Sequence, residues 1–260
     1  MGDQYVQRVT GRGETVIVFD RGPYRALRMA SDPALIQGYR HRFNPTDYRS
    51  EYIHAHLAAS LMSQTQPHTI LCLGLGVGAI PSLLARLYPG VSITAVELND
   101  TVVDAGMTYF GLSGIPNLEI HVGCAAEFVA QHTQKYDQVF VDCYDALGIP
   151  EVCAVPSFFE SVLRRLTHSG ILVANLLPQR KGVSQAFHGW TERLQSWCIP
   201  GRMKSNHTLY GSRDELRLPV EVIERWHGTP LGPLPASVFE CLARAHPADS
   251  FRRQFVKSHD

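Results

Sequence analysis

The chain has 260 residues, of which 45% are hydrophobic, enough for a sizeable core and too many for a disordered chain. Lysine and arginine together number 24, as do aspartate and glutamate, which argues against a nucleic-acid partner gripped by its phosphates. The apolar runs reach only about ten residues, too few to span a membrane. The length favours one α/β domain with an appendage, or two small domains.

The N-terminal region is predicted to be a small β-rich piece followed by a helix. Residues 14–20 and 24–29 are rich in β-forming residues and are separated by the turn sequence RGP, which predicts a hairpin. Residues 30–46 are interpreted as a loop. Tyr39, Arg40 and Arg42 near its end are interpreted as solvated loop residues, with closure over the site as the alternative. Apolar residues then recur at three- and four-residue steps from 46 to 63, which predicts a helix.

From residue 66 onwards, apolar strand-like segments alternate with helical ones. The expected strands are 69–74, 92–98, 118–123, 137–144 and 171–177, and the expected helices are 79–89, 99–110, 126–133, 156–168 and 183–197. This alternation is typical of βαβ units and predicts a doubly wound parallel sheet covered on both faces. We therefore divide the chain into a small N-terminal region, 1–65, and a Rossmann-like α/β domain, 66–260.

The C-terminal part has weaker patterns. We expect a strand at 217–226, a helix at 235–245 and a solvated tail at 251–260. The N-terminal segment has no apolar core or cleavage signal, so no secretory peptide is expected. The six cysteines form no C-x-x-C pair and are interpreted as free thiols of a cytoplasmic protein. No H-E-x-x-H motif occurs, and no metal site is expected.

A glycine-rich loop follows the first strand of the α/β domain. The loop, GLGVG at 74–78, lies where open α/β sheets bind ligands, at the carboxyl end of a strand. Its glycines permit close backbone approach, and Glu97, at the end of the next strand, can accept both ribose hydroxyls of a nucleoside. The P-loop lysine is absent, whereas Ala79 keeps the dinucleotide pattern G-x-G-x-x-A open.

Two aspartates follow the fourth strand in the segment VDCYDALGIP, at 141–150. Asp142 and Asp145 place carboxylates at the same crevice as the glycine loop, although one of them can equally be a turn or cap residue.

These motifs resemble a known family. The run L-x-L-G-x-G-x-G followed by V-E-L resembles class I S-adenosylmethionine-binding domains. The order of hairpin, helix with Tyr52, glycine loop, V-E-L and D-x-x-D-x-x-G-x-P is similar to that of the spermidine synthase family over residues 14–180. The resemblance implies a class I S-adenosylmethionine-dependent transferase fold with a small N-terminal β-hairpin region.

The resemblance also implies a sulfonium ligand, S-adenosylmethionine or its decarboxylated form, and a small-molecule amine substrate. Asp142 would orient and deprotonate the amine, Asp145 would support it or hold a second amine, and Tyr52 would hydrogen-bond either partner. The implied cofactor-binding residues are Gly74, Leu75, Gly76, Gly78, Glu97, Leu98, Cys124, Ala125 and Asp142. The implied substrate residues are Gln37, Tyr52, Tyr144 and Asp145. A homodimer is a further option that rests on resemblance alone.

Three positions depart from the family pattern. Val77 stands where the family has an aspartate that pairs with the propylamine of the decarboxylated cofactor, which argues against that cofactor and leaves room for ordinary S-adenosylmethionine. Cys124 replaces an aspartate that contacts adenine, and Tyr144, with a missing proline nearby, indicates a reshaped pocket. We therefore expect aminopropyl or related alkyl transfer to an amine, releasing methylthioadenosine. The alternatives are a methyltransferase, which releases S-adenosylhomocysteine, and a non-catalytic adenosyl-binding protein.

Overall fold

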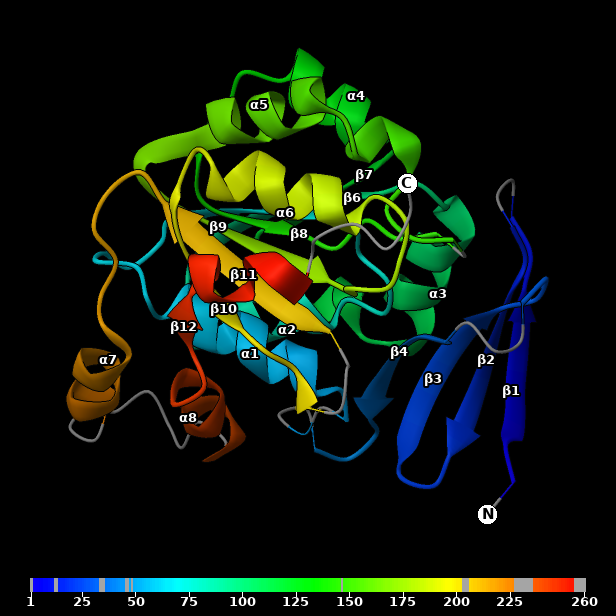
Figure 1. Ribbon diagram of the computed structural model, residues 1–260. Helices are drawn as coiled ribbons and strands as arrows, with labels where there is room; N and C mark the ends of the chain where they lie inside the picture. Colours follow the sequence, from blue (N-terminus) through cyan, green and yellow to red (C-terminus); the bar gives the residue numbers. More distant parts are fainter. Residues whose placement is uncertain are drawn as a thin grey trace.

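The computed structural model describes residues 2–11, 14–32, 36–44, 47, 49–145, 147–202, 206–226 and 236–254. Within these residues the chain forms a four-stranded antiparallel sheet and an eight-stranded mixed sheet. Figure 1 shows the smaller sheet, in blue, standing beside the larger one.

The smaller sheet has the order β1-β2-β3-β4. Its strands are β1 (Gln4–Val9), β2 (Val16–Arg21), β3 (Tyr24–Met29) and β4 (Ile36–His41). The predicted hairpin is confirmed as β2 and β3. The interpretation of 30–46 as a loop is wrong, because β4 pairs with β3. A glycine in mid-strand, Gly38, weakens the strand signal of β4, since glycine has no side chain to pack.

The larger sheet has the order β12-β10-β11-β9-β8-β5-β6-β7. Its strands are β5 (Thr69–Leu73), β6 (Ser92–Glu97), β7 (Leu118–Val122), β8 (Tyr136–Val141), β9 (Leu166–Leu176), β10 (Gln195–Ile199), β11 (His207–Ser212) and β12 (His246–Pro247). Strands β5 to β9 pair with one another in parallel, and β9 pairs with β11 in antiparallel orientation, which confirms the predicted doubly wound sheet. The strand order reverses between β5 and β8, the place where such sheets bind ligands.

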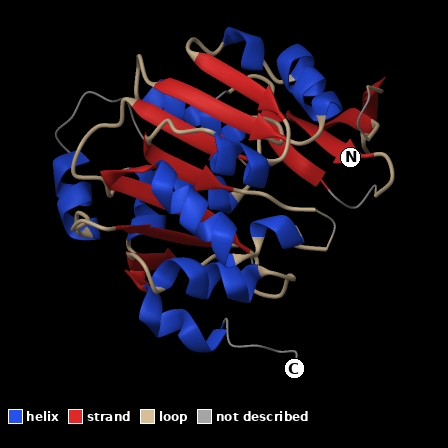
Figure 2. Ribbon diagram, turned by 90° about the horizontal axis from the view of Figure 1, so that it is seen from above, coloured by secondary structure: helices blue, strands red, loops and turns tan. Residues whose placement is uncertain are grey.

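Helices cover both faces of the larger sheet, as Figures 1 and 2 show. They are α1 (Glu51–Ser60), α2 (Ala79–Leu87), α3 (Asp100–Tyr109), α4 (Ala125–Gln131), α5 (Pro156–Arg165), α6 (Val183–Thr191), α7 (Pro219–Trp226) and α8 (Ala236–Leu242). One core joins the sheet to α1, α2 and α8, and a second joins it to α4, α5 and α6. Burial from both sides explains why β5 is apolar after its first residue.

Three expectations for the C-terminal half are wrong. The helix expected over 183–197 ends at Thr191, and β10 follows it, paired with β11. The strand expected at 217–226 is the helix α7, with Pro219 as its first residue and the Glu221 carboxylate accepting a hydrogen bond from the Leu218 amide (3.0 Å). In the expected solvated tail Phe251 is buried, and residues 255–260 lie outside the described residues.

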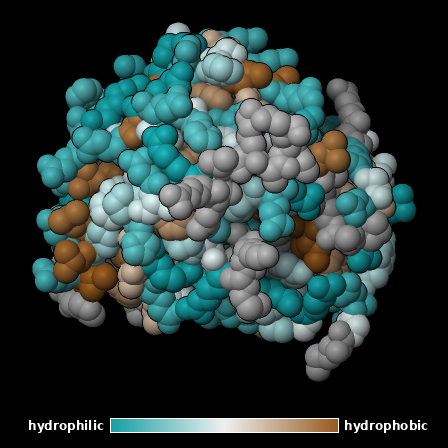
Figure 3. Space-filling model, in the orientation of Figure 1, coloured by the Kyte–Doolittle hydropathy of each residue, from teal (hydrophilic) through white to brown (hydrophobic). Residues whose placement is uncertain are grey.

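In the part of the chain that the structure describes, no helix is both long and apolar enough to cross a membrane. On the face drawn in Figure 3, hydrophilic residues predominate and hydrophobic ones form small separate groups.

Candidate active site

The carboxyl ends of β5, β6, β8 and β9 open on one cavity of about 560 Å³. The strand β4 and the start of α1 complete its wall. The sequence-predicted residues that line it are Gln37, Tyr52, Gly74, Leu75, Gly76, Glu97, Leu98, Cys124, Ala125, Asp142, Tyr144 and Asp145. Gly78 is not among the lining residues: it precedes α2 in a left-handed conformation, against the side chain of Leu112.

The glycine loop approaches the end of β8 very closely. Gly74 has a left-handed φ of 91°, and a Cβ there would collide with the carbonyl oxygen of Asp142. Its amide donates to the carbonyl of Val96 (2.9 Å), which ties the loop to β6 as well. Only glycine fits where the loop passes the end of β8, because any side chain at this position would collide with the backbone.

Glu97 holds the glycine loop by its carboxylate. One oxygen accepts hydrogen bonds from the amides of Leu75 (3.0 Å) and Gly76 (3.3 Å), and the other from the amide of Asn99 (3.1 Å). An ionised carboxylate has about four acceptor sites, so it keeps capacity for further donors. Glu97 is therefore placed to join the loop to a hydroxyl-bearing ligand in the cavity.

Val77 packs against the small sheet instead of presenting a polar group. Only 3% of its surface is exposed, and its core neighbours include Val16 and Phe110. A Cβ at Gly38 would lie 2.6 Å from a methyl group of Val77, so the absence of a side chain at Gly38 makes room for it. The loop thus contributes an apolar contact to β4 where the family pattern has an acid.

Asp142 is the hydrogen-bonding centre of the cavity. Its carboxylate accepts from the amide nitrogen of Asn175 (2.7 Å) and is hydrogen-bonded to Tyr52. Burial raises the pKa of Asp142 above its ordinary value, the hydrogen bonds from Asn175 and Tyr52 oppose this rise, and the charge of Glu97 adds to it.

Tyr52 is a hydrogen-bond donor to Asp142. Burial and the adjacent Asp142 charge raise the pKa of Tyr52 well above its ordinary value, so its phenol stays protonated. The pair can accept a proton at the carboxylate while the phenol fixes its orientation.

Asp145 and Tyr144 have structural contacts besides their place in the cavity wall. One oxygen of Asp145 accepts from the amides of Leu147 (2.7 Å) and Gly148 (2.9 Å) and closes the loop after β8. The Tyr144 hydroxyl donates to the carbonyl of Asn175 (2.9 Å) and accepts from the amide of Leu177 (3.0 Å). The Tyr144 hydroxyl is thus occupied by the backbone of Asn175 and Leu177.

Two asparagines were missed by the sequence analysis. Asn175 lies in β9, and its side-chain oxygen accepts a hydrogen bond from Asn206 (2.9 Å), which also lines the cavity. The signal for Asn175 was a single amide inside the apolar run ILVANLL, since a buried polar group needs partners. Asn206 lies in a region without a motif and had no comparable signal.

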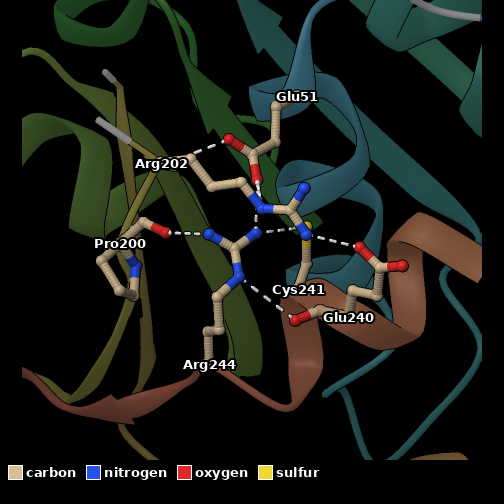
Figure 4. Close-up of polar contacts among 6 residues, drawn as sticks. All are labelled: Glu51, Pro200, Arg202, Glu240, Cys241 and Arg244. Carbon is tan, nitrogen blue, oxygen red and sulfur yellow. Dashed lines mark hydrogen bonds and ion pairs between the residues drawn. The ribbon is translucent and has the colours of Figure 1, made fainter. Parts of the chain in front are cut away.

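A cluster of ion pairs, which we call the C-terminal clamp, fixes the start of α1 beside Tyr52. It consists of Glu51, Arg202, Glu240 and Arg244 (Figure 4). The Glu51 carboxylate contacts Arg244 (2.6 Å) and Arg202 (3.4 Å), and it accepts from the amide of Arg202 (3.0 Å). Arg244 also donates to the Pro200 carbonyl (2.6 Å), and Arg202 pairs with Glu240 (2.6 Å).

This fold is that of class I S-adenosylmethionine-dependent transferases. The family model of the spermine/spermidine synthase domain matches residues 49–178, which is half of the chain. The chain therefore belongs to the spermine/spermidine synthase family. A polyamine aminopropyltransferase of Vibrio vulnificus is 30% identical over 173 residues, 65% of this chain and 58% of that protein. A spermine synthase of Arabidopsis thaliana is 30% identical over 123 residues, 45% of this chain and 34% of that protein.

Solved structures share the fold. A probable spermidine synthase from Corynebacterium glutamicum superposes with a TM-score of 0.72 at 17% identity, over 98% of this chain and 96% of that one. A spermidine synthase in complex with the transition-state analogue AdoDATO superposes with a TM-score of 0.70 at 13% identity, over 97% of this chain and 88% of that one. Human methyltransferase-like protein 13 in complex with SAH superposes with a TM-score of 0.54 at 19% identity, over 81% of this chain and 95% of that one. These confirm the predicted fold class.

Proposed function

We propose that this chain transfers an aminopropyl or related alkyl group from an S-adenosyl sulfonium donor to a small amine. The observation that carries the proposal is the position of the Tyr52–Asp142–Asn175 network. It lies where the strand order reverses, in the same cavity as the glycine loop and Glu97. The family and its relatives support this reaction class.

Each residue of the cavity would have a distinct role in the proposed reaction. Glu97 and the glycine loop would hold the adenosine, and Asp142 would receive a proton from the acceptor amine, exposing its lone pair. A sulfonium donor supplies an activated carbon, and attack by the amine nitrogen on it returns the electron pair of the carbon–sulfur bond to sulfur, releasing neutral methylthioadenosine. Tyr52 and Asn175 would keep Asp142 oriented, so the contribution of the protein is mainly positioning.

Val77 bears on the form of the donor. Its apolar side chain cannot form an ion pair with the donor's ammonium at this position of the glycine loop, which argues against the decarboxylated compound, whose ammonium has no neighbouring carboxylate of its own, and leaves room for S-adenosylmethionine. Transfer of the propyl-length chain from either donor leaves the methyl group on sulfur and so releases methylthioadenosine. Methyl transfer is the second candidate, because the same apolar position removes the family's acidic contact to a decarboxylated donor.

The test is to incubate the protein with each donor and a pool of amines and to identify the nucleoside product by mass spectrometry. We expect methylthioadenosine, and a loss of roughly 10²–10⁴-fold in kcat for Asp142→Asn with donor binding retained. Asp104→Asn, an exposed carboxylate on α3, is the matched control. S-adenosylhomocysteine as the product would establish methyl transfer instead, and no nucleoside product with any acceptor would overturn both enzyme proposals.

Two other expectations stay proposals. We propose a homodimer, on resemblance to the family alone, and a cytoplasmic location, which the six free cysteines support. Light scattering on the purified chain and imaging of a tagged copy would test them separately.

A further inference from the structure

A second cavity, of about 450 Å³, lies between the small sheet and the end of α3. We call it the arginine cavity. It is lined by Arg25, Arg40, Arg42, Phe43, Thr108, Tyr109 and Gly111. We propose that the arginine cavity binds a small oxyanion ligand, such as a phosphate-bearing metabolite. The proposal does not depend on the reaction in the main cavity.

Strand register brings like charges together in this cavity. Asp20 on β2 stands opposite Arg25 on β3, and Arg25 stands opposite Arg40 on β4. Arg42 lies two residues further along the same segment, on the side of Arg40. Directly opposed like charges destabilise a sheet, so three guanidinium groups on one face need counter-charge.

The only carboxylate among the described contacts of these arginines is Asp20. One oxygen accepts from Arg25 Nε (2.9 Å), and the other contacts both Arg25 Nη2 (3.2 Å) and Arg42 Nη1 (3.3 Å). Asp20 is buried, with 7% of its surface exposed, and two arginines share its charge. Three guanidinium groups therefore face one carboxylate.

Arg40 is the group left without a counter-charge. Among the described residues it forms no hydrogen bond or ion pair, although it is half-buried. Its guanidinium lies over Gly111, where a Cβ would collide with it, and Gly111 follows the carboxyl end of α3. The helix end offers only a partial negative charge, about half a unit, so the cavity keeps a positive surplus.

The chemistry of the ligand follows from this surplus. Guanidinium groups match the geometry of phosphate and carboxylate oxygens and bind them through paired hydrogen bonds. The volume admits a small metabolite, and the rings of Phe43 and Tyr109 give the wall an apolar part. A phosphate-bearing ligand suits the site better than a monocarboxylate, because it carries more than one negative charge.

Isothermal titration calorimetry on the full chain tests the proposal. The probes are inorganic phosphate, pyrophosphate and citrate, so that phosphate and polycarboxylate ligands are distinguished, at low and at physiological chloride. We expect saturable binding of pyrophosphate at one site, weakened at least tenfold in Arg40→Ala and in Arg42→Ala. Arg86→Ala, which removes an exposed charge on α2, is the matched control and should bind as the unaltered protein does.

Heat denaturation gives a second measurement on the same variants. Pyrophosphate should raise the Tm of the unaltered protein and of Arg86→Ala, and should leave the Tm of Arg40→Ala unchanged. Equal affinity in Arg40→Ala and Arg86→Ala would overturn the proposal. So would a Tm that falls in Arg40→Ala while no anion binds the unaltered protein, since Arg40 would then only dock β4 onto α3.

Discussion

At the scale of single residues, the site depends on the ionisation of Asp142. Burial raises the pKa of Asp142, and the hydrogen bond from Asn175 lowers it in part. The ionised carboxylate is the form that can accept a proton, so the rise sets a lower pH bound on activity. Because the folded pKa lies above the unfolded value, ionisation of Asp142 lowers folding stability as the pH rises between the two values.

The first residue-scale prediction concerns Asn175→Ala. Asn175 donates to the ionised carboxylate, so its removal should raise the pKa of Asp142 further. The acid limb of a plot of kcat/KM against pH should then move to higher pH. Asn206→Ala, which removes the neighbour of Asn175 but no contact to Asp142, should move the limb much less. An unmoved limb in Asn175→Ala would show that Asp142 does not set it.

At the scale of elements, the glycine loop and β4 form a single packed unit. Val77 lies against Gly38, while Gln37 and Tyr39 from the same strand line the main cavity. One of the residues that depart from the family pattern thus also packs the glycine loop against the small sheet. Restoring an acid at this position would place a charge in the core around Phe110.

We therefore predict that Val77→Asp is strongly destabilising. A carboxylate in this core has no described partner, and its burial together with the lost methyl contacts should lower the free energy of unfolding by about 3 kcal/mol. Val77→Thr keeps the shape and should lose about 1 kcal/mol. Urea denaturation of the two variants measures both values. A stable Val77→Asp that uses the decarboxylated donor faster would mean that the loop can turn this side chain into the cavity.

The strands and helices of the α/β domain were predictable because their periodicity and burial agree. Strand β5 is apolar and buried after its first residue, and the glycine loop follows it directly. The errors fall where a local pattern competes with packing. The β-branched residues of α7 indicate a strand, but Pro219 and Glu221 begin a helix there. In β4, Gly38 weakens the strand signal because it makes room for Val77.

The residues of the candidate site were predictable to the extent that they belong to motifs. Glu97 and Asp142 follow apolar strands, and the parallel sheet brings their strand ends together. Asn206 and Arg244 belong to no motif, and they reach the site only because distant segments fold back onto α1 and β9. Sequence spacing carries no information about such contacts.

At the scale of the whole molecule, the C-terminal clamp joins α8 and the residues that follow it to the wall of the main cavity. Glu51 precedes Tyr52, and its carboxylate is held by Arg244 and Arg202. Both members of the Glu51–Arg244 pair are largely shielded, with side-chain exposures of 30% and 26%. The C-terminal part of the chain therefore helps to set where Tyr52 lies.

We predict that Arg244→Met lowers kcat more than it changes the KM for the donor. Release of Glu51 should let Tyr52 shift away from Asp142, which should lower kcat about tenfold. The lost ion pair should also lower the free energy of unfolding by about 1–2 kcal/mol. Arg252→Met breaks an exposed pair with Asp249 and should change neither quantity by much. Steady-state kinetics with urea denaturation measures the two effects, and a kcat equal to that of Arg252→Met would contradict the prediction.

The clamp also bears on the order in which the protein is made. Glu51 and Arg244 are 193 positions apart in the chain. The ribosome synthesises the N-terminal part first, at about 5–20 residues per second. The small sheet, the glycine loop and Asp142 thus leave the ribosome well before the arginine that anchors the residue next to Tyr52. A nascent chain would reach its working arrangement only after α8 has docked, so incomplete translation products would lack a fully supported site.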